Sequence, residues 1–166
     1  MNTAVVPISL SHVPAFRAAL DTVAKEKRFL AMVEAPPLEQ MESFVGGNIS
    51  KNVAQFVALD GDRLVGWADI IPAWAHGVSH RGSLGMGVIP GYRGQGIGRQ
   101  LLDACINKSW GNGLTRIELE VRADNLAAIR LYKALGFVHE GVKQRGMRID
   151  GVYYDTLQLG LLRHEA

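Results

Sequence analysis

Cysteine is nearly absent from this sequence, which has one, Cys105, in 166 residues. A lone thiol cannot form an internal disulfide, so a disulfide-stabilised secreted domain is excluded and we expect a cytoplasmic protein. Long apolar runs are also absent, since no stretch approaches the ~18 residues that a membrane-spanning helix needs. The N-terminal segment has no cationic stretch followed by a long apolar one, so we expect neither a secretory signal nor a membrane partner.

A strong charge of one sign is missing as well. Lysine and arginine total 18 against 16 acidic residues, which leaves a net charge of +2. This excess is too small to predict a nucleic-acid partner, and the basic residues are dispersed outside one short stretch. Hydrophobic residues make up 48 % and charged residues 20 %, an ordinary balance for a globular protein. We therefore expect a single domain over residues 1–166.

Hydrophobic periodicity predicts the order of the secondary-structure elements. A short first strand ends near Pro7, which confines it to a sheet edge or a bulge. Ser11 is placed to cap a first helix, and a second helical pattern begins at Leu38. Asp-Gly pairs at 60–61 and 150–151 predict two tight hairpins. With the strands "RGSLGMGVIP" and "RIELEV", each followed by a helix, the order indicates a mixed α/β domain.

The stretch "GYRGQGIG", residues 91–98, concentrates glycines between a strand and a helix. Such glycines allow the backbone to approach a ligand closely, and the free N–H groups and dipole of the helix start favour a phosphate. Arg93 and Arg99 are placed to add charged contacts at the rim. A P-loop is excluded because no Gly-Lys pair occurs, and a dinucleotide fingerprint counted from Gly94 fails at Arg99. A tight turn without any ligand remains the alternative.

A second segment, "NLAAIRLYKALGF" at residues 125–137, favours a ligand site over a ligand-free turn. Together the two segments resemble the GNAT superfamily of N-acetyltransferases. The cofactor-loop pattern Gln/Arg-x-x-Gly-x-Gly/Ala is matched by Arg93, Gly96 and Gly98, and the pattern Asn-x-x-Ala-x-x-x-Tyr-x-x-x-Gly-Phe is matched within residues 125–137. The resemblance covers residues 53–161. It implies a mostly antiparallel sheet of six or seven strands, about four flanking helices, and a splayed strand pair that holds the cofactor.

The resemblance also implies a chemistry, the transfer of an acetyl group from acetyl-CoA to a primary amine by direct attack in a ternary complex. Main-chain atoms of the strand at 86–88 would hold the pantetheine arm, with the Val88 N–H stabilising an oxyanion. Asn125 would contact pantetheine, cap its helix, or do both. Tyr132 would be the general acid for the leaving thiolate, and a core tyrosine is the alternative. The expected cofactor-binding residues are Met86, Gly87, Val88, Arg93, Gly94, Gln95, Gly96, Ile97, Gly98, Arg99 and Asn125.

The general base is not identified by the sequence. Four residues are candidates, acting directly or through a water: Glu118, Glu120, His80 and Asp155. Cys105 lies one turn after Leu101 on the apolar face of a helix, so we interpret it as a buried core thiol. The histidines show no metal-ligand spacing, and no metal is expected.

The acceptor amine is the least constrained part of the prediction. The ending "RIDGVYYDTLQLGL" resembles the bacterial branch that acylates amino acids and phosphinothricin-like compounds, although a hairpin turn alone explains its Asp-Gly pair. Phe29, Met32 and Trp74 are candidates for an apolar acceptor pocket, and Arg28 for a carboxylate contact; packing or surface roles are the alternative for each.

Two functions of different class remain open. The first is an N-acetyltransferase for a small-molecule amine, with the α-amino group of an amino acid as one option. The alternative is a non-catalytic acyl-CoA-binding regulatory module, which would not need a phenol at Tyr132. The superfamily often dimerises through its C-terminal strands, so a homodimer is also left open.

Overall fold

One seven-stranded sheet organises the protein, whose computed structural model describes residues 2–165. The strand order is β1-β2-β3-β4-β5-β7-β6, and neighbours are antiparallel except for β4 and β5, which are parallel. The elements in chain order are β1 (Thr3–Pro7), the 3-10 turn η1 (Leu10–His12), α1 (Val13–Lys25), α2 (Leu38–Ser50), β2 (Ala54–Asp60), β3 (Arg63–Pro72), η2 (His76–Val78), β4 (Arg81–Val88), α3 (Ile97–Gly111), β5 (Arg116–Arg122), α4 (Leu126–Ala134), β6 (Val138–Ile149) and β7 (Val152–Leu162). This confirms the predicted mixed α/β class.

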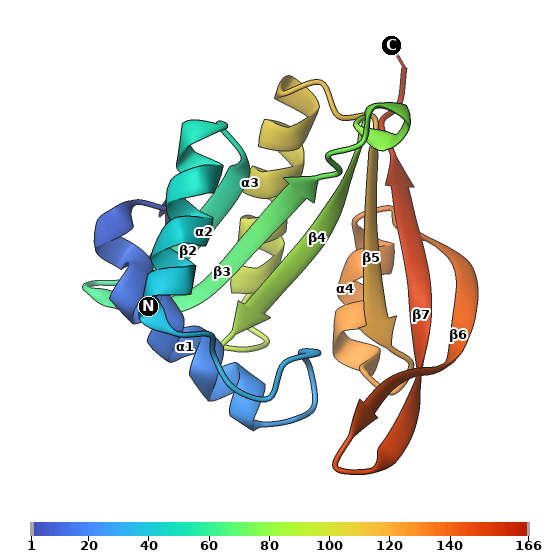
Figure 1. Cartoon of the computed structure of the whole chain (residues 1–166), viewed down its shortest axis with the longest axis horizontal. Coiled ribbons are helices and arrows are strands. Elements are labelled where there is room, and N and C mark those ends of the chain that lie inside the picture. Colours follow the sequence, from blue (N-terminus) through green and yellow to red (C-terminus); the bar gives the residue numbers. More distant parts are fainter. Residues whose placement is uncertain (1, 166) are drawn as a thin grey trace.

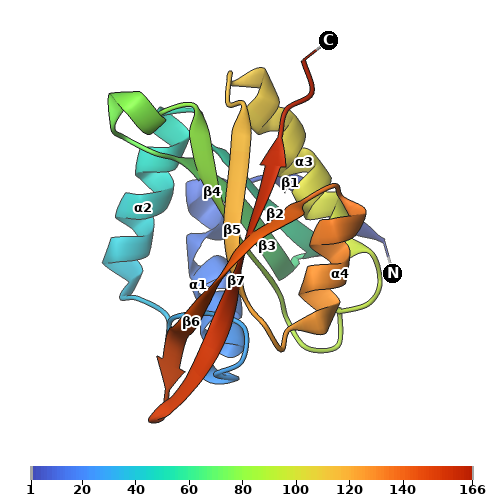
Figure 2. The ribbon, with the colours of Figure 1, turned by 90° about the vertical axis from the view of Figure 1, so that its right-hand side faces the viewer.

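Helices cover both faces of the sheet. Figure 2 shows α1 and α2 on one face and α3 and α4 on the other. The core is continuous through the strands between them: on one side the Phe16 ring of α1 packs on Trp67 of β3, with centroids 5.6 Å apart. On the other side Cys105 of α3 donates its thiol to the Ala68 carbonyl oxygen at 3.3 Å. Burial raises the pKa of this thiol to about 12, so the predicted core role of Cys105 is confirmed.

The sheet opens between β4 and β5 (Figure 1). The two strands pair only from Arg81 with Arg116 to Ser83 with Glu118, at their N-terminal ends. Beyond Ser83, β4 continues to Val88 without β5 beside it, because the two strands diverge. The splayed strand pair that the family resemblance implies is therefore present.

Local sequence signals explain most element boundaries, with one correction. Pro7 ends β1, which is an edge strand as expected. Asp150 and Gly151 both have positive φ, 50° and 81°, and form the tight turn between β6 and β7. Ser11, however, does not cap α1. It lies inside η1, and α1 begins at Val13 because the preceding residues form a 3-10 turn first.

Candidate active site

The loop between β4 and α3 is shaped by glycines in the left-handed region. Gly91, Gly94 and Gly96 have φ values of 87°, 72° and 83°. A Cβ on any of them would meet nothing within 4 Å, so the backbone conformation rather than crowding requires glycine, and the space beside the loop is open. The first N–H group of α3 that is hydrogen-bonded to a backbone carbonyl is that of Gln100, which donates to the oxygen of Gly96, the residue before the helix, at 3.1 Å. The N–H groups at 97–99 therefore have no helical carbonyl and form a potential anion site.

Arg93 fastens this loop to the end of α1 instead of extending into solvent. Its Nε donates to the Val88 carbonyl oxygen at 2.7 Å, and its terminal nitrogens bind the Glu26 carboxylate, one of them at 2.9 Å. The guanidinium also stacks over the Phe29 ring, 4.5 Å from its centroid. Of the two arginines expected at the rim, Arg99 alone extends from the start of α3 with a side chain more than half exposed.

The edge of β4 that faces the opening offers main-chain groups. Ile89 donates its N–H to the Val65 oxygen of β3 at 3.0 Å. Because an antiparallel ladder alternates, and the β3–β4 register is uninterrupted, the N–H groups of Val88 and Met86 are directed away from β3 and into the opening. The same alternation directs Gly87 toward β3. An extended ligand can add to the free positions as another strand would.

Across the opening, α4 contributes Asn125 and Tyr132. The Asn125 Oδ1 accepts from the Ala128 N–H at 3.3 Å, so this residue caps α4, and its pantetheine contact stays a prediction. The Tyr132 side chain is 7 % exposed and packs against Phe137, with ring centroids 5.8 Å apart. Burial raises the pKa of the Tyr132 phenol above its ordinary value, which keeps the hydroxyl protonated near neutral pH. A protonated phenol fits the predicted donor role.

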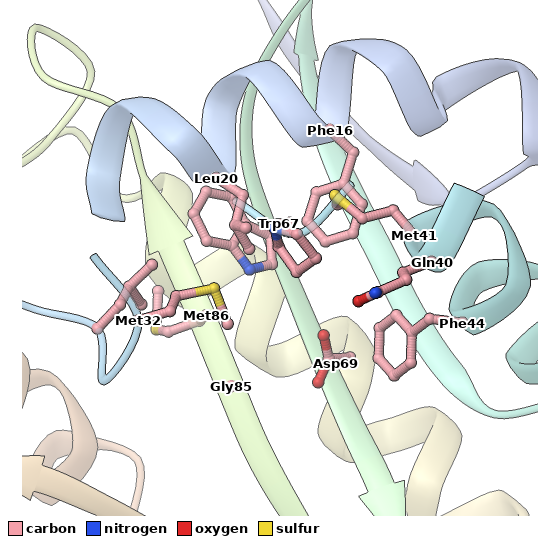
Figure 3. A pocket seen from close by; sticks show the side chains of 12 residues that line it. Phe16, Leu20, Met32, Gln40, Met41, Phe44, Trp67, Asp69, Gly85 and Met86 are labelled. Atoms are coloured by element: carbon pink, nitrogen blue, oxygen red, sulfur yellow. The ribbon is translucent and has the colours of Figure 1, made fainter. Parts of the chain in front are cut away.

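A cavity of about 430 Å³ lies on the other face of the sheet, between α1, α2 and strands β3 and β4. Figure 3 shows its aromatic, aliphatic and methionine side chains, together with one carboxylate, that of Asp69. The lining residues are Phe16, Leu20, Leu30, Met32, Pro36, Gln40, Met41, Phe44, Trp67, Asp69, Gly85 and Met86.

Asp69 is a candidate functional residue that the sequence analysis missed. It is opposite Gly85 in the β3–β4 ladder, and a Cβ added to Gly85 would lie 3.4 Å from its Oδ1. The carboxyl group therefore rests against bare β4 backbone at the cavity. Burial raises the pKa of Asp69 to about 7. The available signal was a single acid in the apolar strand "VGWADI", on the same face as Trp67.

The two glutamates considered as bases are engaged in ion pairs on β5. Glu118 binds Arg116 Nε at 3.0 Å. Glu120 accepts from Lys143 Nζ at 2.7 Å and from the Thr156 hydroxyl at 2.6 Å. Burial alone would raise the pKa of Glu120, but these hydrogen bonds hold it below its ordinary value. A carboxylate stabilised in this way is a weaker proton acceptor than Asp69.

Of the other residues expected on the acceptor side, one lines the cavity and the others lie elsewhere. Met32 lines the cavity as expected. Trp74 is 96 % exposed on the β3–β4 connection and takes no part in the cavity lining. Arg28 and Phe29 stack on each other, 5.7 Å from guanidinium carbon to ring centroid. Asp150 binds Lys27 Nζ at 2.9 Å and so ties the β6–β7 hairpin to the end of α1.

Further acidic and basic groups give no sign of a metal centre within residues 2–165. No group of three or more His, Cys, Asp and Glu side chains is arranged to hold a metal ion there. His80 and Asp155 are exposed, and Asp155 accepts the Arg145 N–H at 2.9 Å. In the same part of the chain, no helix is long and apolar enough to cross a membrane.

Comparison with known proteins places this geometry in a family. The model of the acetyltransferase (GNAT) family matches residues 20–137. The N-alpha-acetyltransferase RimI of Mycobacterium tuberculosis is 37 % identical over 106 residues, which cover 61 % of this chain and 62 % of that protein. The match thus spans less than two thirds of the relative's length.

Solved structures share the fold over almost the whole chain. A GNAT-family acetyltransferase from Streptococcus pneumoniae has a TM-score of 0.91 at 27 % identity, covering 98 % of this chain and 100 % of that one. A phosphinothricin acetyltransferase from Sinorhizobium meliloti, solved in complex with AcCoA, has a TM-score of 0.89 at 17 % identity, covering 98 % and 89 %. These relatives come from different branches, so they do not select the amino-acid branch suggested by the C-terminal sequence. The chain belongs to the GNAT family of acetyltransferases.

Proposed function

We propose that this chain is an N-acetyltransferase that moves an acetyl group from acetyl-CoA to a primary amine of a small molecule. The observation that carries the proposal is the opening between β4 and β5, with free main-chain groups along one edge and a glycine-shaped loop at its end. Family membership and a shared fold with an AcCoA-bound structure support it. We further propose that residues 1–166 act as one domain, as the sequence analysis expects.

The chain's own residues suit each part of a CoA thioester. Backbone N–H groups from Arg93 to Arg99 suit the pyrophosphate, since several small charge–dipole contacts of about 0.3–1 kcal/mol each combine at a helix start. The β4 edge at Met86 and Val88 suits the pantetheine amides. The Asn125 side chain, at the start of α4, would bind the pantetheine arm from the other side. Gly87, which the ladder directs toward β3, contributes its lack of a side chain: a Cβ there would lie within 3 Å of the Trp67 ring.

The transfer requires a proton to leave the amine and another to reach the sulfur. Bound acetyl-CoA would supply the acetyl group as a thioester, whose carbon–sulfur bond breaks as the carbon–nitrogen bond forms. The Val88 N–H, directed into the opening, is placed to stabilise negative charge on the carbonyl oxygen. Tyr132 holds the proton for the departing thiolate. Such positioned acids typically contribute about 10²–10⁴-fold to a rate.

Two measurements on the wild-type protein test this function. Calorimetric titration with acetyl-CoA should show one binding site per chain, and thiol release from acetyl-CoA should accelerate when a primary amine is added. A panel of small amines, amino acids and short peptides separates a small-molecule acceptor from a protein N-terminus. Acetyl-CoA that does not bind would contradict the proposal, and turnover confined to peptides would contradict its small-molecule part.

A further inference from the structure

The cavity beneath α1 and α2 has a composition that selects an acceptor, and this inference rests on the proposed function. Its volume of about 430 Å³ suits a small organic molecule. Three aromatic side chains, Phe16, Phe44 and Trp67, contribute to an otherwise aliphatic and methionine lining. Such a surface binds an apolar group by excluding water from it.

Polar side chains in the cavity lining are few, and none carries a positive charge. Gln40 and Asp69 are the polar side chains among the lining residues, and none of these residues is cationic. The nearby Arg17 is turned to the backbone, where its Nε donates to the Pro36 oxygen at 2.8 Å. A carboxylate entering the cavity would lose its water without gaining a cation, at a substantial cost in free energy. An ammonium group would meet Asp69.

We propose that the acceptor is a primary amine with a bulky apolar substituent and no carboxylate, and that Asp69 binds its ammonium group and accepts its proton. Figure 3 shows Asp69, Gln40 and Phe44 grouped at one end of the cavity. The Asp69 carboxylate rests against Gly85, next along β4 to Met86, whose N–H is directed into the opening where the thioester is expected. The cavity therefore reaches the β4 edge from the face opposite α3 and α4.

The proton transfer balances with the groups present. The ammonium ion gives one proton to a carboxylate oxygen of Asp69, and the amine lone pair then forms the bond to the acetyl carbon. Tyr132 gives its proton to the departing thiolate, which leaves as the free thiol, and the second proton lost by the nitrogen restores the Tyr132 phenol through solvent. Asp69 releases its proton to solvent, so one proton is released for each acetyl group transferred. With a pKa of about 7 in the empty cavity, Asp69 is matched to proton transfer near neutral pH.

Other titratable groups near Asp69 do not compete for this role. The cavity-lining residues from α1, the α1–α2 connection, α2 and β4 are uncharged, including Gln40, and so is Gln55, which lies opposite Asp69 on β2. Behind the sheet, Cys105 has a pKa of about 12 and remains a neutral thiol. The acidic limb of the pH profile is therefore assigned to Asp69.

Three probes of graded chemistry test the acceptor class in the wild-type protein. 2-Phenylethylamine has an apolar group and no carboxylate, L-phenylalanine adds the carboxylate, and ethylamine lacks the apolar group. We expect kcat/KM for 2-phenylethylamine to exceed both others by about 100-fold. Equal or better turnover of L-phenylalanine or ethylamine would overturn the acceptor assignment while leaving acetyl transfer itself established.

Asp69→Asn tests the role of the carboxylate. It should lower kcat/KM for 2-phenylethylamine about 100-fold, abolish the acidic limb near pH 7, and leave the calorimetric affinity for acetyl-CoA unchanged. Asp69→Glu should restore part of the rate. An unchanged rate and pH profile would overturn the role of Asp69, whereas failure of the wild-type protein to bind acetyl-CoA would instead contradict the proposed function.

Phe44→Arg tests the missing cation while keeping the Asp69 side chain in place. Because Phe44 and Asp69 lie at the same end of the cavity, the added guanidinium also faces the Asp69 carboxylate, so the readout is a ratio of two substrates rather than an absolute rate. Phe44 is 42 % exposed at the cavity, so the longer cation is accommodated at its mouth. A guanidinium there would pair with a substrate carboxylate, and the ratio of L-phenylalanine to 2-phenylethylamine turnover should rise at least about 10-fold. No change in this ratio would contradict the view that the missing cation sets the specificity.

Discussion

The two sides of the candidate active site are built from different parts of the chain. On the cofactor side, the backbone forms the site: glycines at positive φ, the free start of α3, and the unpaired edge of β4. On the acceptor side, side chains from α1, the α1–α2 connection, α2, β3 and β4 form the cavity. A backbone site requires fixed glycine spacing, whereas a side-chain cavity requires only apolar residues of suitable size. We therefore expect the first to vary little within a family and the second to differ between its members.

The largest effect is expected when a side chain and a negative charge are placed in the backbone site. Gly96→Glu should reduce acetyl-CoA affinity by more than about 100-fold in calorimetry, because the carboxylate would lie where the pyrophosphate is expected.

Gly113→Glu is the matched control for that variant. Gly113 also has a positive φ, 92°, with open space around a Cβ, but it follows the opposite end of α3. The two substitutions thus introduce the same strain and charge. Equal affinity of the two variants for acetyl-CoA would show that the loop is not the anion site.

A smaller effect is expected at Tyr132, the proposed proton donor on α4. Tyr132→Phe should lower kcat about 100-fold, with an unchanged dissociation constant for acetyl-CoA, because it removes the proton donor and keeps the packing on Phe137. Rate and binding constants measured with saturating amine separate these effects. If kcat stayed at the wild-type value, Tyr132 would be a core residue.

Arg93 joins the cofactor loop to the end of α1, and its removal should have a moderate effect on acetyl-CoA affinity and on stability. Arg93→Ala loses the contacts to Val88 and Glu26, each partly screened by solvent, so we expect acetyl-CoA affinity to fall about 3- to 10-fold and the melting temperature to fall by a few degrees. Arg99→Ala, at a far more exposed pair, should leave the melting temperature unchanged. A stability loss equal for the two variants would exclude a fastening role for Arg93.

The smallest expected effect is on stability at the acceptor side, and it depends on pH. Burial raises the pKa of Asp69 from 3.8 to about 7, so the folded protein loses stability as pH rises through this window and the carboxylate becomes charged. The limit is about 1.4 kcal/mol for each pKa unit, reduced by the water that reaches the cavity. Asp69→Asn should therefore melt a few degrees above the wild-type protein at pH 8 and at the same temperature at pH 4. If Asp69→Asn were less stable than the wild-type protein at pH 8, the charged Asp69 carboxylate would not be destabilising the fold.

The features that the sequence could predict are those that depend on the local backbone, and the features that it could not predict depend on contacts between distant side chains. The hairpins at 60–61 and 150–151, the edge strand ending at Pro7 and the start of α4 at Asn125 depend on local backbone chemistry, and all are present. The start of α1 was misplaced because η1 intervenes, with Ser9 and His12 in a capping arrangement. No local pattern predicted that turn.

Interactions between distant segments account for the rest. Glu26 is 67 residues from Arg93, so the engagement of this guanidinium could not be inferred from the loop. In the sequence Asp69 is a single acid in a mostly apolar strand, and its place at a cavity depends on the packing of α1 and α2 over it. Trp74, an expected wall residue, lies outside because the connection after β3 carries it into solvent.

The most direct test of the central claim is to identify the product. The wild-type protein, incubated with acetyl-CoA and 2-phenylethylamine, should yield the N-acetylated amine by mass spectrometry together with one equivalent of free thiol. Binding of acetyl-CoA with neither thiol nor acetylated amine formed, here or with any primary amine of the panel, would contradict acetyl transfer to these amines and favour the alternative, an acyl-CoA-binding module.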